Sequence, residues 1–238
     1  MASELFAALA DDLEQLIRLH DRELDAETLA ALRAAEFPHG LALPPAGEAG
    51  QQAYANMAAA LAEPTSLDEL AADYAAIYLN NSLGASPYES VWLSDDHLAC
   101  AAPMFELREL YAAAGLRAAD WRSRFDDHFV LQLQYLQHLL HVPAEGRQAA
   151  SFIDEHVGYW FPDFAQRVSL FCATSFYAAL AELTHVWLQR LRGVLGEIND
   201  LPIPSRDEMT ARINRKLALD KAEVAPIRFM PGGQGPSW

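Results

Sequence analysis

Basic residues are scarce in this sequence. Its 238 residues include 17 Lys and Arg against 33 Asp and Glu, which gives a net charge of −16 at pH 7. Lys216 and Lys221 are the only lysines. Binding to nucleic acid or to an anionic membrane surface depends on clustered cationic side chains. The composition therefore argues against both kinds of partner.

Cysteine and long apolar runs are also nearly absent. Cys100 and Cys172 lie far apart in apolar surroundings, which argues against a disulfide framework or a cysteine metal site, and we expect both to be reduced core residues. No stretch of about 18 uncharged apolar residues occurs, and the N-terminal segment lacks the basic and apolar regions of a secretory signal. We therefore expect a cytoplasmic protein.

The common catalytic motifs are missing as well. The sequence contains no G-x-S-x-G elbow, P-loop, G-x-G-x-x-G or kinase signature. We therefore expect a protein that is not an enzyme. One alternative of another class stays open: His138 and His141 lie one helical turn apart and, with Asp127, could hold the metal ion of a hydrolase.

The acidic charge is concentrated in the first part of the chain. Residues 1–100 carry a net charge of −14, and residues 101–238 carry −2. Such a surface either keeps the protein soluble or attracts and steers a basic partner. Composition alone does not separate these two interpretations.

Composition and periodicity predict an all-α fold. Alanine and leucine make up roughly a third of the chain, and leucine outnumbers valine plus isoleucine by about two to one. Caps and breakers divide the chain into roughly nine or ten helices in one globular bundle spanning residues 1–222. The longest helix is predicted from about Asp163 to Leu195. We expect a hinge near residues 80–90 and a flexible tail over 223–238.

Individual helix ends have recognisable signals. Asp25 is a predicted N-cap, and Ser66 with Glu69 forms a capping-box pattern. Pro103 suits the first turn of a helix that ends at Gly115. A strongly apolar helix is predicted to follow His128.

Aromatic side chains are concentrated in the sequence on either side of one turn-rich segment, 80–90. Aromatic groups beside acids suit the capture of an apolar, cationic peptide. Most of these residues are equally compatible with a helical core, and Asp127 with a helix cap. Pro87, Tyr88 and Trp92 are the best candidates for a binding role. The full set is Tyr74, Tyr78, Pro87, Tyr88, Trp92, Phe105, Tyr111 and Trp121, close in sequence to Asp127 and His128.

Three ordered segments in this region resemble the TorD/DmsD family of redox-enzyme maturation chaperones. They are Ser86-Pro87-Tyr88-Glu89-Ser90-Val91-Trp92, then Tyr111-Ala112-Ala113-Ala114-Gly115-Leu116, then Asp126-Asp127-His128-Phe129 at the start of a helix. Segments 156–164 and 176–183 are also similar to the family. The resemblance covers roughly residues 65–190 and implies the same all-helical, TorD-like fold.

The resemblance also implies a function and a set of residues. A member would bind the precursor or the twin-arginine signal peptide of a molybdopterin-dependent oxidoreductase and assist cofactor insertion before export. An assembly chaperone of the nitrate-reductase type, whose client is not exported, is the alternative within this fold. The residues that the resemblance assigns to signal-peptide binding are Pro87, Tyr88, Ser90, Trp92, Asp127 and His128.

The resemblance carries three further expectations. No cofactor is expected, although weak GTP binding is known among relatives and no residue motif here supports it. The state is expected to be a monomer or a helix-swapped dimer, with the break at 199–205 as the hinge for exchange. The partner is the catalytic-subunit precursor, with no nucleic acid and no insertion into a membrane.

Overall fold

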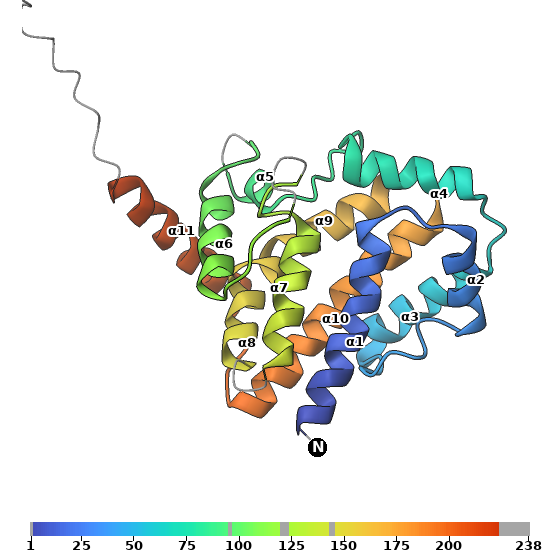
Figure 1. The fold of residues 1–238 in the computed structure, drawn as a ribbon, viewed down its shortest axis with the longest axis horizontal. Helices are drawn as coiled ribbons and strands as arrows, with labels where there is room; N and C mark the ends of the chain where they lie inside the picture. The colour runs from blue at the N-terminus through green and yellow to red at the C-terminus, as the bar shows by residue number, and fades with distance from the viewer. Residues whose placement is uncertain (1, 95–96, 120–123, 143–145, 224–238) are drawn as a thin grey trace, which may run out of the picture.

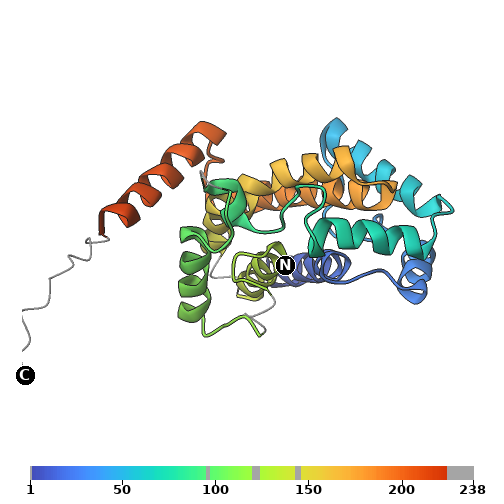
Figure 2. The ribbon, with the colours of Figure 1, turned by 90° about the horizontal axis from the view of Figure 1, so that it is seen from above.

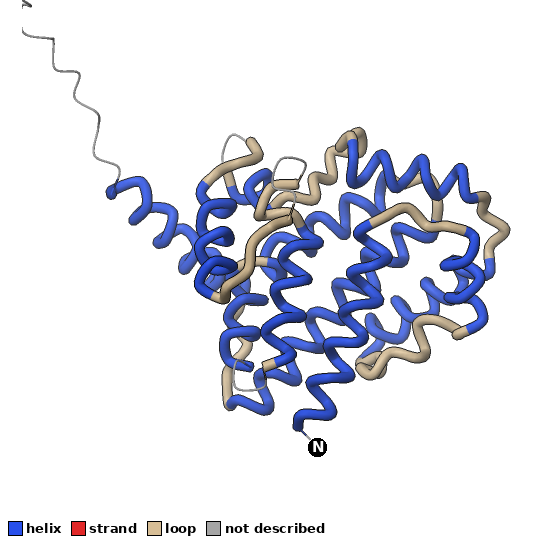
Figure 3. The backbone as a smooth tube through the Cα atoms, in the orientation of Figure 1, coloured by secondary structure: helices blue, strands red, loops and turns tan. Residues whose placement is uncertain are grey.

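The structure is a computed structural model that describes residues 2–94, 97–119, 124–142 and 146–223, and all elements within these ranges are helical (Figures 1 and 3). Eleven α-helices and one π-helix are present in these ranges, so the predicted all-α class is confirmed. They are α1 (Ala2–Asp21), α2 (Ala26–Ala34), α3 (Gly47–Ala62), α4 (Leu67–Tyr74), η1 (Ala75–Leu79), α5 (Glu89–Leu93), α6 (Ala102–Ala113), α7 (Phe129–His141), α8 (Gly146–Glu155), α9 (Val157–Phe171), α10 (Ser175–Asn199) and α11 (Arg206–Glu223).

Local capping chemistry sets several helix ends where the sequence predicts them. The Asp25 carboxylate accepts a hydrogen bond from the Thr28 N–H at 2.7 Å and caps α2. Ser66 and Glu69 form the reciprocal capping box of α4. Pro103 lies in the first turn of α6, and Gly115 follows its end with φ of +75°. These three predictions are confirmed.

Helix α10 is the central element of the bundle. It packs against α9, α3 and α8, while α1 and α7 pair with each other. Figures 1 and 2 show α1 and α7 side by side across the bundle from α9 and α10. Loops at the upper end of α7 in Figure 1 bring α5 and α6 next to its first turn. The residues of the candidate site described below lie around that end of α7.

The core between these layers is rich in aromatic rings. Phe129 stacks on Phe161 at a centroid distance of 4.2 Å, and His20 meets Phe129 edge-on at 4.9 Å. The His20 ring nitrogens also hydrogen-bond to Tyr78 and Thr184, at 2.5 and 2.9 Å. Burial lowers the pKa of His20 to about 3, so this imidazole is a neutral core group.

The helix predicted from Asp163 to Leu195 is two helices, so this prediction is wrong. The chain breaks between Phe171 and Ser175 because the buried Asp73 carboxylate captures two backbone donors there. Its oxygens accept hydrogen bonds from Ala173 N–H at 2.9 Å and Thr174 N–H at 2.6 Å. These donors would otherwise serve a continuous helix.

Cys100 also differs from the prediction. It is exposed because it lies in the loop between α5 and α6, where its φ is +63°. Cys172 is half-buried at the α9–α10 break. The predicted tail, 223–238, lies outside the described residues except for Glu223, which ends α11. Within the described ranges, no helix is both long enough and apolar enough to cross a bilayer.

Candidate functional site

The segment before α5 and the segment before α7 are joined through their backbones. Phe129 N–H donates to the Pro87 carbonyl at 2.8 Å, and Glu89 N–H donates to the Asp127 carbonyl at 3.2 Å. Together they form an antiparallel bridge between Tyr88 and His128. Two helices that begin 40 residues apart therefore start from one fixed point.

Asp127 caps a helix, but not the one that follows it in the chain. Its side-chain Oδ2 accepts a hydrogen bond from Ser90 N–H at 2.9 Å, in the first turn of α5. His128 is the N-cap of α7, with Nδ1 accepting from Val130 N–H at 3.1 Å. Asp127 thus stabilises α5 across 37 residues of sequence, while α7 has its own cap.

Burial sets the protonation of this pair. Burial raises the pKa of Asp127, and the hydrogen bonds from Ser90 oppose the rise. Burial lowers the pKa of His128, so its ring is neutral and free to accept at Nδ1. The second carboxylate oxygen of Asp127, Oδ1, is buried and has no hydrogen-bond partner in the structure.

A series of side-chain contacts connects this bridge to α9 and back to the segment before α5. The Gln132 side-chain N–H donates to the Asp127 carbonyl at 3.0 Å, and its Oε1 accepts from the Trp160 indole at 3.2 Å. Trp160 stacks against Trp92 at 6.4 Å. The Trp92 indole donates to the Ser86 carbonyl at 2.8 Å, which closes the loop onto itself.

The structure brings all six residues assigned to signal-peptide binding together, but it exposes few of them. Pro87, Ser90, Asp127 and His128 are buried, and only Tyr88 and Trp92 are half-exposed. Tyr88 lies edge-on to His128 at 5.0 Å. In the free chain, a ligand could therefore touch the two aromatic rings, while the other four residues hold those rings in place.

Two exposed apolar side chains are associated with the same helices. Leu98, in the loop that follows α5, is 62% exposed, and Phe105 on α6, which packs against α5, is 53% exposed. The Arg108 guanidinium lies 5.6 Å from the Phe105 ring and donates to Asp126, with N···O distances of 2.9 and 2.8 Å. We use the name aromatic surface for Tyr88, Trp92, Leu98 and Phe105, the partly or fully exposed apolar side chains on or next to α5 and α6.

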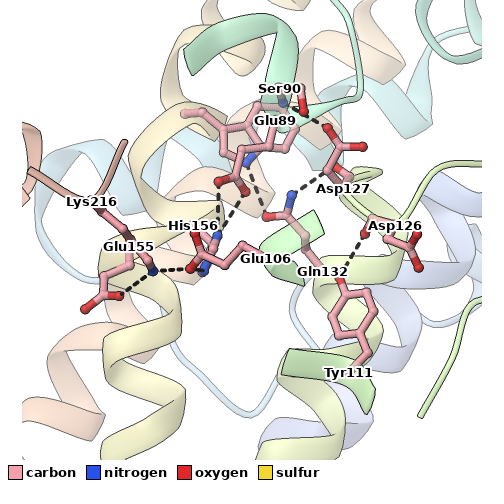
Figure 4. Close-up of polar contacts among 11 residues, drawn as sticks. Glu89, Ser90, Glu106, Tyr111, Asp126, Asp127, Gln132, Glu155, His156 and Lys216 are labelled. Carbon is pink, nitrogen blue, oxygen red and sulfur yellow. Dashed lines mark hydrogen bonds and ion pairs between the residues drawn. The ribbon is translucent and has the colours of Figure 1, made fainter. Parts of the chain in front are cut away.

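A second polar cluster lies directly behind α5 and was missed by the sequence analysis (Figure 4). The His156 ring lies between two carboxylates, with Nδ1 at 3.0 Å from Glu89 and Nε2 at 3.2 Å from Glu106. Lys216 of α11 hydrogen-bonds to Glu106 and lies 3.6 Å from Glu155. Glu89 and Ser90 are adjacent, so the start of α5 joins this cluster to Asp127.

The charges of this cluster determine each other. Burial disfavours the charged imidazolium of His156. The negative charges of Glu89 and Glu106, and the hydrogen bonds that His156 makes with them, outweigh this effect and raise its pKa to about 9. Burial raises the pKa of Glu89 despite the neighbouring His156. For Glu106, burial is outweighed by His156 and Lys216, and its pKa is lowered. We therefore describe His156 as charged at neutral pH.

The sequence contained only a weak signal for this cluster. Glu89 belongs to the Ser86–Trp92 segment and His156 to the 156–164 segment, both of which resemble the family. Neither side chain stands out among 33 acids and 8 histidines. Their pairing spans 67 residues and depends on α5 lying against the α8–α9 junction.

The alternative metal site does not form. Asp127 precedes the N-cap of α7, whereas His138 lies nine residues beyond the first residue of that helix, which is roughly 14 Å along the helix axis at 1.5 Å per residue. Among the described residues, no group of three or more His, Cys, Asp or Glu side chains is arranged to hold a metal ion. The prediction that Asp127, His138 and His141 could share an ion is therefore wrong, because Asp127 lies at the N-terminal end of α7 and both histidines lie in its last turn.

Fold and site together define a class: an all-α domain in which two partly exposed aromatic rings are held by buried, hydrogen-bonded polar groups. A family model described as nitrate reductase delta subunit matches residues 43–166, more than half of the chain. The chain belongs to this family, and its resemblance to the TorD/DmsD chaperones is confirmed.

Individual relatives give the same assignment. The chaperone protein TorD of Vibrio cholerae serotype O1 (strain ATCC 39541 / Classical Ogawa 395 / O395) is 31% identical over 141 residues, covering 55% of this chain. That match spans 64% of the relative, slightly less than two thirds of its length. TorD of Escherichia coli O7:K1 (strain IAI39 / ExPEC) is 28% identical over 186 residues, covering 73% of this chain and 89% of the relative.

One solved structure is also similar. It is a crystal structure from Archaeoglobus fulgidus described as a redox enzyme maturation protein, with 20% identity and a TM-score of 0.46. The similarity covers 79% of this chain and 94% of that chain.

Proposed function

We propose that this protein is a maturation chaperone for a molybdopterin-dependent oxidoreductase. It binds the precursor of the catalytic subunit through the twin-arginine signal peptide and assists cofactor insertion before export. The names of its relatives, chaperone protein TorD, support the class. The observation that carries the proposal for this chain is the aromatic surface, which lies on a buried acidic base.

The chemistry of a twin-arginine leader fits this surface. Such a leader joins paired arginines to an apolar segment, and the apolar segment would pack on Tyr88 and Trp92. Exposed aromatic rings supply contact area and cation–π attraction at low entropic cost. The net charge of −14 over residues 1–100 favours approach of the basic end.

Our first prediction concerns the two half-exposed rings. Tyr88→Ala and Trp92→Ala should each weaken binding of a synthetic twin-arginine leader by about 1–3 kcal/mol, because each removes a contact ring. Isothermal titration calorimetry measures the change. Phe171→Ala is the matched control, since Phe171 is 52% exposed on α9 and is not part of the aromatic surface.

Circular dichroism on each variant would verify that it remains folded. Unchanged leader affinity for folded Tyr88→Ala and Trp92→Ala would contradict the assignment of this surface. An equal loss of leader affinity in Phe171→Ala would show that leader binding is not specific to the aromatic surface.

A second candidate within the class is an assembly chaperone whose client is not exported. The match to the nitrate reductase delta subunit model over residues 43–166 favours it. Affinity capture from native cytoplasm separates the two: a molybdoenzyme precursor with its leader supports the first, and a leaderless molybdoenzyme supports the second.

Several expectations accompany the proposal. We expect a cytoplasmic, non-enzymatic protein without a resident cofactor, acting as a monomer or a helix-swapped dimer. Weak GTP binding stays a prediction from the resemblance, and calorimetry with GTP tests it.

A further inference from the structure

Helix α11 is attached to the bundle differently from the other helices. Figures 1 and 2 show that it leaves the α8–α9 side of the bundle and that its far end projects away from it. Four residues of α11 that face the bundle follow the spacing i, i+3, i+7 and i+10, which places them on one stripe of the helix. In order they are Arg206, Met209, Ile213 and Lys216.

The two ends of this stripe are held by charge. Arg206 donates to Asp163 of α9 at 2.6 Å, and its guanidinium lies 5.1 Å from the Tyr159 ring centroid. Lys216 reaches Glu106 of α6 and Glu155 of α8. Three helices of the bundle thus each supply an acid to α11.

The middle of the stripe packs incompletely. Ile213 is buried and Met209 is half-buried. A cavity of about 330 Å³ lies beside Met209, lined in part by Phe161 and Pro162. Another of about 200 Å³ lies beside Ile213, lined in part by Leu93. Both cavities are partly open to solvent, so α11 leaves part of this groove unfilled.

The groove without α11 would be acidic and partly apolar. Among the described residues, its unpaired acids would be Glu155 and Asp163, with Glu89 and Glu106 on either side of the His156 cation. Asp154 and Arg192 form an ion pair beside the cavity at Met209. Its apolar wall includes Leu93 and Pro103. The complementary ligand is a helix with two basic residues about three turns apart and two apolar residues between them, which is the pattern of α11 itself.

We propose that the groove of α6, α8 and α9 beneath α11 is a docking site for a basic amphipathic helix of the client precursor, and that α11 occupies it when no client is bound. The inference rests on the proposed function for the identity of the partner. Glu89 ties this groove to the start of α5, so the groove is continuous with the base of the aromatic surface.

Charge substitutions on α11 in the full chain test the proposal. Arg206→Glu with Lys216→Glu replaces two attractions by repulsion, and Arg206→Gln with Lys216→Gln only removes them. Arg215→Glu is the matched control, because Arg215 is exposed on the same helix outside the docking stripe. The probes are a labelled synthetic peptide of residues 203–223 and the purified client precursor.

We expect faster amide hydrogen exchange in α11 of both double variants than in the native chain. The exchange rate in α11 of Arg215→Glu should equal that of the native chain. Because the open groove is populated more often, the double variants should bind the peptide and the precursor roughly three- to tenfold more tightly than the native chain. Fluorescence anisotropy measures the affinity for the peptide, and calorimetry measures the affinity for the precursor.

Each opposing result overturns the proposal at a defined step. Unchanged exchange in both double variants would show that these ion pairs do not hold α11. Tighter binding of the peptide with unchanged or weaker binding of the precursor would leave the chaperone function standing and remove the client as the occupant. Dimers of the double variants in light scattering, without tighter precursor binding, would assign the groove to α11 of a second copy.

The proposed function fails separately. A precursor that binds neither the native chain nor any variant, while the peptide still binds, contradicts the chaperone assignment and with it the identity of the partner.

Discussion

The charge on His156 is held in place by two carboxylates from different helices. Folding raises its pKa from about 6.5 to about 9, so the folded state binds the proton more tightly than the unfolded state. The resulting stabilisation is fully present below about pH 6.5 and is lost as the pH rises through about 9. Glu89 and Glu106 provide this preference.

We therefore predict that the free energy of unfolding falls by about 1–3 kcal/mol between pH 6.5 and 9.5 because of this one group. Urea unfolding of the native chain and of His156→Gln across this range measures it. The stability difference between the two proteins should shrink as the pH rises. A difference that stays constant from pH 6.5 to 9.5 would contradict a charged His156.

At the scale of single residues, the sequence named six residues that the structure brings together, but it did not give the role of each side chain. Asp127 was equally compatible with a helix cap and a binding group, and the structure shows a cap on α5, 37 residues away. Local spacing cannot predict such a contact, because it depends on which loops meet. His156 and Lys216 were missed for the same reason.

At the scale of helices, the sequence predicted starts better than interruptions. Caps such as Asp25 and Ser66 act within one turn, so their effect can be read locally. The break between α9 and α10 depends on Asp73, about 100 residues earlier in the chain. Apolar periodicity continues across that break and therefore predicted one helix.

The α8–α9 junction also depends on a close contact, and Gly158 makes it possible. A Cβ at this position would lie 2.5 Å from the Ile153 carbonyl oxygen and 2.7 Å from its Cγ2. We predict that Gly158→Ala lowers the free energy of unfolding by about 1–3 kcal/mol through this overlap. Urea unfolding provides the measurement.

Gly193→Ala is the control within α10. Its added Cβ would meet nothing closer than an Arg190 Nη1 at 3.9 Å. Alanine has the higher helix propensity, so this change should leave stability unchanged or raise it by up to about 1 kcal/mol. Equal effects of the two substitutions would show that the junction tolerates a methyl group.

At the scale of the whole molecule, we expect the net charge of −16 to affect the association rate of a basic partner more than its dissociation rate. We predict that the association rate of a twin-arginine leader peptide falls roughly tenfold between 20 and 300 mM NaCl, because salt screens the attraction between the acidic chain and the basic peptide. The dissociation rate should change much less. Stopped-flow fluorescence measures both rates. An association rate that is independent of salt would remove the steering role.

The bridge between Tyr88 and His128 has a consequence for the evolution and engineering of such proteins. Its hydrogen bonds join main-chain atoms of Pro87, Glu89, Asp127 and Phe129, so the frame does not depend on the ring carried at position 88. The side chain at 88 is thereby separable from the scaffold that presents it, whereas the Trp92 indole is part of that scaffold through its hydrogen bond to the Ser86 carbonyl. Under the proposed function, a different client preference would arise by exchanging the ring at position 88 on an unchanged backbone.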